Sequence, residues 1–257
     1  MKGSFPIYPD LAGKVAVVTG GSRGLGAETC RLLAANGMKV AVNGRNEAAI
    51  EDVLESIRSK GGKAIGVPAD VTSTAGLERV RRQVEEELGQ VDVLAAFAGG
   101  SGEPIPTEQI PDDQWDFVVQ ANLTATFLTV KCFLPGMIER RRGSILTMAS
   151  SAARLPSMSS AAYAAAKAGV VMFSRHVANE VGKHGVRINC LAPSAILTER
   201  MQRLMPEDQQ RQVAAAFPLG RMGQPADVAQ AAVFLASDSS SWLTGVTLDV
   251  AGGRIIV

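Results

Sequence analysis

A tyrosine and a lysine lie four residues apart in an alanine-rich segment. The stretch Ser-Ser-Ala-Ala-Tyr-Ala-Ala-Ala-Lys-Ala-Gly-Val-Val-Met-Phe predicts a helix with Tyr163 and Lys167 on the same face. An ammonium group beside a phenol favours the phenolate, so we expect Lys167 to lower the pKa of Tyr163 toward the working pH, where the phenol can act as an acid or a base. The alternative is an ordinary amphipathic helix whose lysine extends along an apolar surface. The chain has only two tyrosines, which weighs against that alternative.

A glycine-rich turn, Thr19-Gly-Gly-Ser-Arg-Gly-Leu-Gly, follows the first predicted strand and precedes a segment of helical character. Glycines allow positive φ and a close approach of the backbone, and free N–H groups at a helix N-terminus favour a pyrophosphate. The spacing differs from both the dinucleotide fingerprint G-x-G-x-x-G and the Walker loop, so a simple tight turn is the alternative. The residues expected to line this phosphate site are Gly20, Ser22, Arg23, Gly24, Leu25 and Gly26.

The second predicted strand ends Val-Asn-Gly-Arg, with no acidic residue at its tip. An acid at that place would accept the ribose 2′-hydroxyl of NAD. Arg45 and Arg23 can instead pair with a 2′-phosphate, because a guanidinium group matches phosphate geometry. We therefore predict a preference for NADP(H), with NAD(H) as the alternative cofactor and solvated surface charges as the alternative role of both arginines.

Asp70 and Val71 follow the third predicted strand. Asp70 could accept a hydrogen bond from the adenine amino group, with Val71 beside it. It could equally cap a helix that begins near Thr72 or Ser73. The sequence does not separate these two roles.

Apolar, β-branched runs alternate with longer segments of helical spacing along the chain. Several of the helical segments close with glycine, at Gly37, Gly61 and Gly89. This alternation predicts an α/β fold: a single-domain, Rossmann-like, doubly wound parallel sheet with helices on both faces, over residues 1–257. The predicted strands are Val15–Thr19, Lys39–Asn43, Ala64–Pro68, Val91–Phe97, Ser144–Met148 and Val186–Leu191.

The overall composition also favours one globular domain. The 257 residues are 46% hydrophobic and 20% charged, and the 26 basic residues nearly balance the 25 acidic ones, so we expect no nucleic-acid or membrane partner. There is no signal-peptide core or long apolar run. The scattered Cys30, Cys132 and Cys190 suit buried, reduced thiols rather than disulfides or a metal site. We therefore expect a cytoplasmic, unanchored protein.

These features, taken in order, resemble the short-chain dehydrogenase/reductase family from Gly13 to Gly253. The similarity rests on the glycine-rich turn, on Ser150 ahead of Tyr-x-x-x-Lys, and on Asn122 within Trp-Asp-Phe-Val-Val-Gln-Ala-Asn-Leu. It also includes Arg-Ile-Asn-Cys-Leu-Ala-Pro and the closing Phe-Leu-Ala-Ser-Asp to Thr-Gly pattern. No single motif is decisive, but their order and spacing are highly specific.

The resemblance implies a role for each matching residue. Tyr163 would give a proton to a carbonyl oxygen while hydride arrives from nicotinamide, and would act as the base in the reverse reaction. Ser150 would bond that oxygen, Lys167 would hold the nicotinamide ribose, and Asn122 would support a proton-relay water. Ser150 as a loop polar residue and Asn122 as a buried helix residue are the alternatives. The residues implied to touch the rest of the cofactor are Ala98 and Gly99 at the adenosine ribose and Ile196 and Thr198 at the carboxamide.

The chain departs from the family pattern at three places. Where the family has Asn-Asn-Ala-Gly, this chain has Ala96-Phe97-Ala-Gly, which removes polar side-chain support and adds bulk beside the cofactor. Ser194 stands where a glycine commonly follows the proline, and Ala251 stands where an aspartate commonly precedes the closing glycines. None of these changes removes a proton donor.

Among family members the chain most resembles the 3-oxoacyl-acyl-carrier-protein reductases. Those enzymes meet the acidic carrier protein with arginines, and Arg141, within Arg140-Arg-Arg142, matches one such position, whereas His184 replaces the other. The alternative is that these arginines do not bind a carrier protein but complement the dipole at the C-terminus of their helix. The segment 193–218 is expected to form a substrate lid, with a surface excursion as its alternative. The apolar residues expected around the substrate are Ala152, Ala153, Leu155, Met158, Met201, Leu204 and Met205.

These features favour NADPH-dependent reduction of a ketone, with a 3-oxoacyl thioester as the first choice of small-molecule carbonyl substrate. The alternatives are a dehydrogenase that oxidises an alcohol or sugar with NAD(P), and an NADP-binding regulatory protein without turnover. The resemblance further implies a homotetramer or homodimer formed through the long helices that contain Asn122 and Tyr163.

Overall fold

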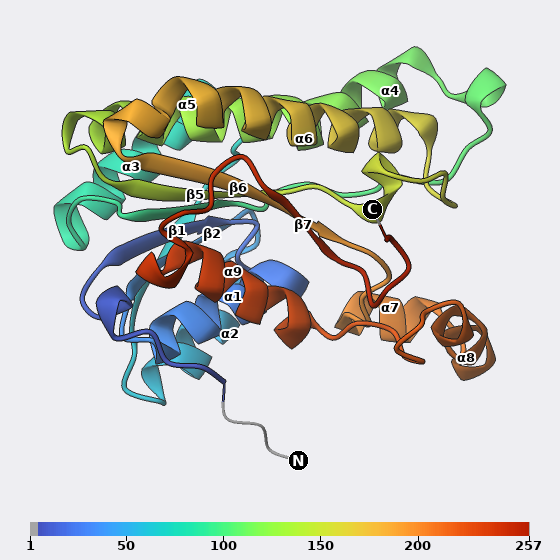
Figure 1. The fold of residues 1–257 in the computed structure, drawn as a ribbon, viewed down its shortest axis with the longest axis horizontal. Helices are drawn as coiled ribbons and strands as arrows, with labels where there is room; N and C mark the ends of the chain where they lie inside the picture. Colours follow the sequence, from blue (N-terminus) through green and yellow to red (C-terminus); the bar gives the residue numbers. More distant parts are fainter. Residues whose placement is uncertain (1–4, 257) are drawn as a thin grey trace.

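A seven-stranded parallel sheet forms the centre of the computed structural model, which describes residues 5–256 (Figure 1). The strand order is β3-β2-β1-β4-β5-β6-β7, and every neighbouring pair is parallel. The chain starts in the middle of the sheet and winds outward in both directions, which confirms the predicted doubly wound α/β fold. The strands are β1 (Val15–Thr19), β2 (Lys39–Gly44), β3 (Lys63–Pro68), β4 (Val93–Ala96), β5 (Gly143–Met148), β6 (Val186–Pro193) and β7 (Thr247–Val250).

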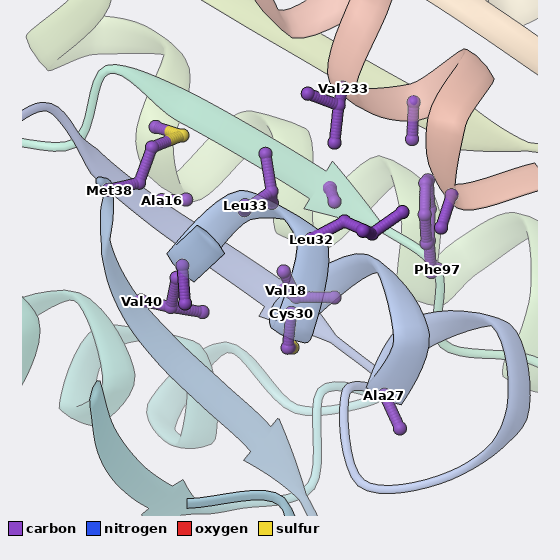
Figure 2. Close-up of a cluster of buried hydrophobic side chains, with 14 of the residues drawn as sticks. Ala16, Val18, Ala27, Cys30, Leu32, Leu33, Met38, Val40, Phe97 and Val233 are labelled. Atoms are coloured by element: carbon purple, nitrogen blue, oxygen red, sulfur yellow. The ribbon is translucent and has the colours of Figure 1, made fainter. Parts of the chain in front are cut away.

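Helices cover both faces of this sheet (Figure 1). On one face lie α1 (Gly24–Ala35), α2 (Glu47–Arg58) and α9 (Pro225–Ala236), and on the other lie α3 (Thr74–Glu87), α5 (Ala125–Glu139) and α6 (Ala161–Val181). Because successive strand residues point to opposite faces, each strand contributes to two cores. Val18 joins Cys30, Leu33 and Val233 in the core beneath α1 and α9, as Figure 2 shows, while Val17 faces the other layer.

The sequence missed β7, the edge strand at Thr247–Val250. All four of its residues are only partly buried, so it lacks the continuous apolar run that marks the other strands. It pairs with β6 alone, between Cys190 and Pro193 on that strand.

The long helix that contains Asn122 is interrupted. It runs as α4 (Asp112–Val119), a π-helical turn at Gln120–Thr124, and then α5. Within residues 5–256, the combined helix 112–139 is the one helix long and apolar enough to cross a membrane by length and composition, and 39% of its most apolar window is buried in the protein. It contributes Val130, Phe133 and Met137 to the core against the sheet.

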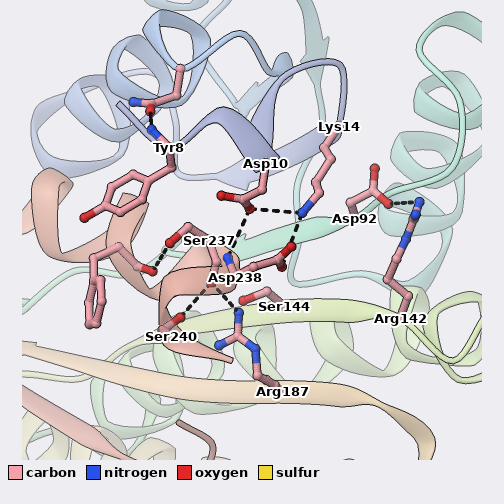
Figure 3. Close-up of polar contacts among 12 residues, drawn as sticks. Tyr8, Asp10, Lys14, Asp92, Arg142, Ser144, Arg187, Ser237, Asp238 and Ser240 are labelled. Atoms are coloured by element: carbon pink, nitrogen blue, oxygen red, sulfur yellow. Dashed lines mark hydrogen bonds and ion pairs between the residues drawn. The ribbon is translucent and has the colours of Figure 1, made fainter. Parts of the chain in front are cut away.

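Polar contacts anchor the amino ends of the strands, far from the sheet edge where ligands bind in such folds (Figure 3). Lys14 lies 3.2 Å from Asp10 and 3.4 Å from Asp238. Arg187 donates to the carbonyl oxygens of Leu235 and Ser237, both at 3.1 Å. These contacts tie β1 and β6 to the end of α9.

The three cysteines are free, and two of them are buried as expected. Cys132 is only half-buried, so the expectation of a buried packing residue is wrong there. It lies in a hollow of about 460 Å³ between α3 and α5. Among the described residues, no group of three or more His, Cys, Asp or Glu side chains could hold a metal ion.

Candidate functional site

Tyr163 and Lys167 lie in the first two turns of α6, beside the carboxyl end of β5. Ser160 begins this helix, and its hydroxyl accepts a hydrogen bond from the Tyr163 backbone N–H at 3.3 Å. Lys167 Nζ lies 5.5 Å from the centroid of the Tyr163 ring, so the structure brings the pair together on one helix face. The Lys167 side chain is buried, and Nζ donates to the carbonyl oxygen of Met148 at 2.7 Å.

Burial shifts the pKa values of both residues. It lowers the pKa of Lys167 to about 8, because a buried ammonium loses its hydration. It raises the pKa of Tyr163, and a hydrogen bond with the Ser150 side chain acts in the opposite direction. The expectation that Lys167 lowers the Tyr163 pKa is therefore wrong for this structure: burial outweighs the opposing effect, and that effect comes from Ser150.

Asn122 is fully buried in the π-helical turn and faces the loop that follows β4. Its amide donates to the carbonyl oxygens of Gly100 at 2.9 Å and Val118 at 2.8 Å, and it accepts from the Gly100 N–H at 3.2 Å. A Cβ atom on Gly99 would lie 2.5 Å from Asn122 Oδ1 and 3.3 Å from Lys167 Nζ. Asn122 and Lys167 therefore both lie beside Gly99. The hydrogen bonds of the Asn122 side chain hold the loop that follows β4. Its role with a relay water stays a prediction.

The glycine-rich turn between β1 and α1 has no room for side chains at its centre. A Cβ atom on Gly26 would lie 2.1 Å from the Gly20 carbonyl oxygen, so only glycine allows this packing. Helix α1 begins at Gly24 without a side-chain cap and without an acidic residue in its first turn. Its free N–H groups and dipole suit a phosphate, so the residues present fit the pyrophosphate of a dinucleotide.

The adenosine end of this site lies where β2 meets the same turn. A Cβ atom on Gly44 would lie 2.7 Å from Ser22 Oγ, so Ser22 and Arg23 are next to Gly44 and Arg45. Both arginines are exposed. The Arg45 charge also helps to lower the pKa of Asp70, after the larger effect of hydrogen bonds from Thr72.

Asp70 forms a local turn. Its Oδ1 accepts from the Thr72 N–H at 2.9 Å and the Thr72 hydroxyl at 2.8 Å. Ser73, not Asp70, caps α3, since its hydroxyl accepts from the Gly76 N–H at 3.0 Å. The helix-cap interpretation of Asp70 is therefore wrong, and its contact with adenine stays a prediction.

Thr19 supplies the polar support that the sequence placed in doubt at Ala96-Phe97. Its hydroxyl accepts from the N–H groups of Phe97 at 3.1 Å and Ala98 at 3.3 Å. Phe97 is 9% exposed and joins the core that contains Ile196 and α9 (Figure 2). Ala98 packs with Val71 in a separate cluster, which brings these two predicted cofactor residues together.

Two short helices, α7 (Glu199–Leu204) and α8 (Glu207–Ala215), make up most of the predicted lid. The segment before α7 is joined to the segment after α8. Ile196 pairs with Gly223, and the Leu197 N–H donates to the Gly223 carbonyl oxygen at 2.8 Å. Thr198 caps α7 through the Met201 N–H at 3.3 Å. The Thr198 Cγ2 atom would lie 3.4 Å from a Cβ on Gly24, so the segment before α7 borders the glycine-rich turn.

The arginines at 140–142 lie away from this constellation, because they precede β5 whereas Ser150 follows it. The six residues of β5 span about 20 Å. Arg140 donates to Gln90 and the Val91 carbonyl oxygen, both at 2.6 Å, and Arg142 lies 2.6 Å from Asp92. Arg141 is exposed and donates to the Lys183 carbonyl oxygen at 3.0 Å, next to His184.

A doubly wound sheet with a glycine turn before α1 and a Ser-Tyr-Lys group beyond β5 defines a dinucleotide-dependent oxidoreductase. Comparison with known proteins agrees with that class. A model of the short chain dehydrogenase family matches residues 14–209. The chain is 37% identical over 243 residues to a 3-oxoacyl-acyl-carrier-protein reductase of Chlamydia pneumoniae, which covers 95% of this chain and 97% of the relative.

Two further relatives show the range of this similarity. The 2,5-dichloro-2,5-cyclohexadiene-1,4-diol dehydrogenase of Sphingobium indicum is 35% identical over 95% of this chain and 96% of its own. The structure of a 7α-hydroxysteroid dehydrogenase complexed with NADH and 7-oxoglycochenodeoxycholic acid superposes with a TM-score of 0.91 at 33% identity, covering 96% of each chain. The chain belongs to the short-chain dehydrogenase/reductase family. It is an NAD(P)(H)-dependent oxidoreductase that acts on CH–OH or C=O groups.

Proposed function

We propose that this protein reduces a ketone to a secondary alcohol with NADPH, and that Tyr163 is the proton donor. The observation that carries the proposal is the buried contact of Tyr163 with Ser150 and Lys167, at the edge of the sheet where the glycine-rich turn lies. A bound nicotinamide cofactor supplies the hydride. Every other part of the reaction falls to the side chains of this chain.

A tyrosine phenol, with an ordinary pKa of 10.0, is protonated at neutral pH, and burial raises the pKa of Tyr163 further. Tyr163 is therefore ready to donate a proton to the carbonyl oxygen. Ser150 holds the phenol and can donate to the same substrate oxygen. Lys167 is held by Met148 and can bind the cofactor ribose with its remaining N–H groups. Asn122 keeps the Gly99–Gly100 backbone beside Lys167.

Selection for NADP(H) follows from the junction of β2 with the glycine-rich turn. A side chain at Gly44 would meet Ser22 Oγ, so an acid at this position would require Ser22 to move. Arg45 and Arg23 are exposed beside it and can bind the 2′-phosphate. In this proposal, Asp70 and Val71 lie beside the adenine of the cofactor.

Replacing Arg45 and Arg23 together with methionine is expected to raise KM for NADPH by about 10- to 100-fold, since each charged contact contributes about 1.5–3 kcal/mol before solvent screening reduces it. KM for NADH should change less than threefold. Steady-state kinetics with both cofactors measures this. Equal losses with NADPH and NADH would contradict the proposed 2′-phosphate site.

Exposed apolar side chains border the site and favour an apolar substrate. Leu155 and Met158, in the loop before α6, are 45% and 91% exposed, and Leu204 on α7 is 67% exposed. Such flexible apolar side chains suit an acyl chain better than a sugar. Together with the 3-oxoacyl-acyl-carrier-protein reductases among the relatives, they favour a 3-oxoacyl thioester.

With an acetoacetyl thioester and NADPH, we expect consumption of the cofactor and formation of the 3-hydroxyacyl product. The absorbance of NADPH follows the first, and chromatography identifies the second. A panel of apolar ketones and sugars provides the comparison. Reduction of apolar ketones without thioesters would contradict the thioester assignment alone, whereas oxidation of a sugar with NAD would favour the dehydrogenase alternative.

A second copy of the chain is the proposed partner on the face formed by α4, α5 and α6. Phe117, Phe127 and Met172 on these helices are 64%, 42% and 60% exposed, which is unusual for a surface that faces only water. We therefore propose a homodimer or homotetramer formed through this face, and separately the binding of an acidic carrier protein at Arg141, which lies next to His184.

A further inference from the structure

The turn that carries Ser150 is fastened to the rest of the molecule by side chains. It runs from Ser150 to Arg154, with the Ser150 hydroxyl accepting from the Ala152 N–H at 3.2 Å. The Ser151 hydroxyl donates to Ser194 Oγ at 3.2 Å. At the other end of the turn, Arg154 Nη2 lies 3.2 Å from Asp249 Oδ2, across 95 residues of sequence.

This ion pair joins the turn to the edge strand β7. Asp249 lies opposite Ala192 of β6, and its neighbours Leu248 and Val250 pack on the α1 and α9 side. Asp249 and Thr247 therefore point to the α6 side of the sheet. The Arg154 and Asp249 side chains are 20% and 12% exposed, so the pair is shielded from water.

The pair is not arranged as an efficient stabiliser of the fold. Among the described residues, Arg154 Nε, Asp249 Oδ1 and Thr247 Oγ1 are buried without a hydrogen-bond partner. Removing charges from water costs free energy that incomplete pairing does not repay, so this pair is weak evidence for stabilisation of the fold. The parts that it joins are the Ser150 turn and the last strand of the sheet.

We propose that the Arg154–Asp249 pair is a positioning device that fixes the turn carrying Ser150, and so keeps the Ser150 side chain beside Tyr163. Its importance for turnover rests on the proposed function, in which Tyr163 is the acid. Neither residue touches the reacting atoms. The titratable group that contacts the Tyr163 ring is Lys167 on the same helix, and Cys190 on β6 feels the charges of both Lys167 and Arg154.

The chain allows a direct test, because its only other tyrosine is Tyr8. In a Tyr8→Phe background, the ultraviolet absorption of phenolate reports Tyr163 alone, in the protein without cofactor or substrate. The quantity measured is the fraction of Tyr163 that is ionised, at the highest pH at which circular dichroism shows that the protein is still folded. Arg154→Met is expected to lower that fraction about threefold to tenfold, because the Ser150 hydrogen bond that favours phenolate is weakened.

The double variant Arg154→Met/Asp249→Leu separates positioning from stability. It removes both charges, so its Tm should recover above that of Arg154→Met, while the ionised fraction of Tyr163 stays low. Arg142→Met is the matched control, because it breaks an Arg–Asp pair at the far end of β5 and should leave Tyr163 unchanged.

Phenolate in the Arg154→Met variant at the parental level would overturn the proposal, as would an equal loss in Arg142→Met. Recovery of phenolate together with Tm in the double variant would show a purely structural pair, which also overturns it. Absence of turnover with every ketone would contradict the proposed function and leave this titration unaffected.

Discussion

Replacing Tyr163 with phenylalanine is expected to lower kcat by two to four orders of magnitude, the range that a positioned general acid contributes. The change removes only the phenol oxygen, on whose pKa Ser150 acts. The ring keeps its place over Lys167, and the backbone bond to Ser160 is unaffected. Steady-state kinetics with NADPH and the best ketone of the panel measures the loss.

Cofactor binding provides the control for that variant. The glycine-rich turn and Arg45 do not depend on the phenol, so Kd for NADPH, measured by fluorescence titration, should stay within about threefold of the parent. A variant with parental kcat would refute the assignment of Tyr163 as the acid. A variant that no longer binds NADPH would show that the phenol acts in binding instead.

Replacing Lys167 with methionine is expected to abolish most turnover and to change how stability depends on pH. Folding lowers the pKa of Lys167 from 10.5 to about 8, so between these values the unfolded chain binds more protons than the folded one. The folded wild type therefore gains stability as pH rises through this window. Relative to the variant, the gain is on the order of 3 kcal/mol.

Denaturant unfolding of both proteins without cofactor, from neutral pH to about pH 10.5, measures this difference. At neutral pH the variant escapes the cost of a buried ammonium but leaves the Met148 carbonyl oxygen without its donor, and these effects largely offset each other. Parallel stability curves for the two proteins would contradict a depressed Lys167 pKa.

The sequence predicted those parts of the fold that depend on local pattern. Buried β-branched runs marked six strands, and β1 has the predicted bounds Val15–Thr19. The edge strand β7 was not predicted, because its partly buried residues do not form such an apolar run. The π-helical turn at Asn122 was not predicted either, since the sequence Gln-Ala-Asn-Leu-Thr is compatible with an ordinary α-helix. The turn lies where Asn122 forms hydrogen bonds with the Gly100 backbone.

The site shows the same division. Tyr163 and Lys167 are one helical turn apart, so their meeting follows from sequence alone. The direction of the Tyr163 pKa did not follow, because burial is a property of the whole fold. Thr19 and Arg154 were missed because their partners lie 78 and 95 residues away, and short motifs do not report such distances.

The central claim is that this chain reduces ketones with NADPH through Tyr163. One assay tests it most directly: NADPH consumption with an acetoacetyl thioester, by the parent and by Tyr163→Phe at matched concentration. We expect rapid consumption by the parent, a loss of two to four orders of magnitude in the variant, and unchanged NADPH binding. Equal rates in the two proteins, or no ketone reduced by a parent that binds NADPH, would contradict it.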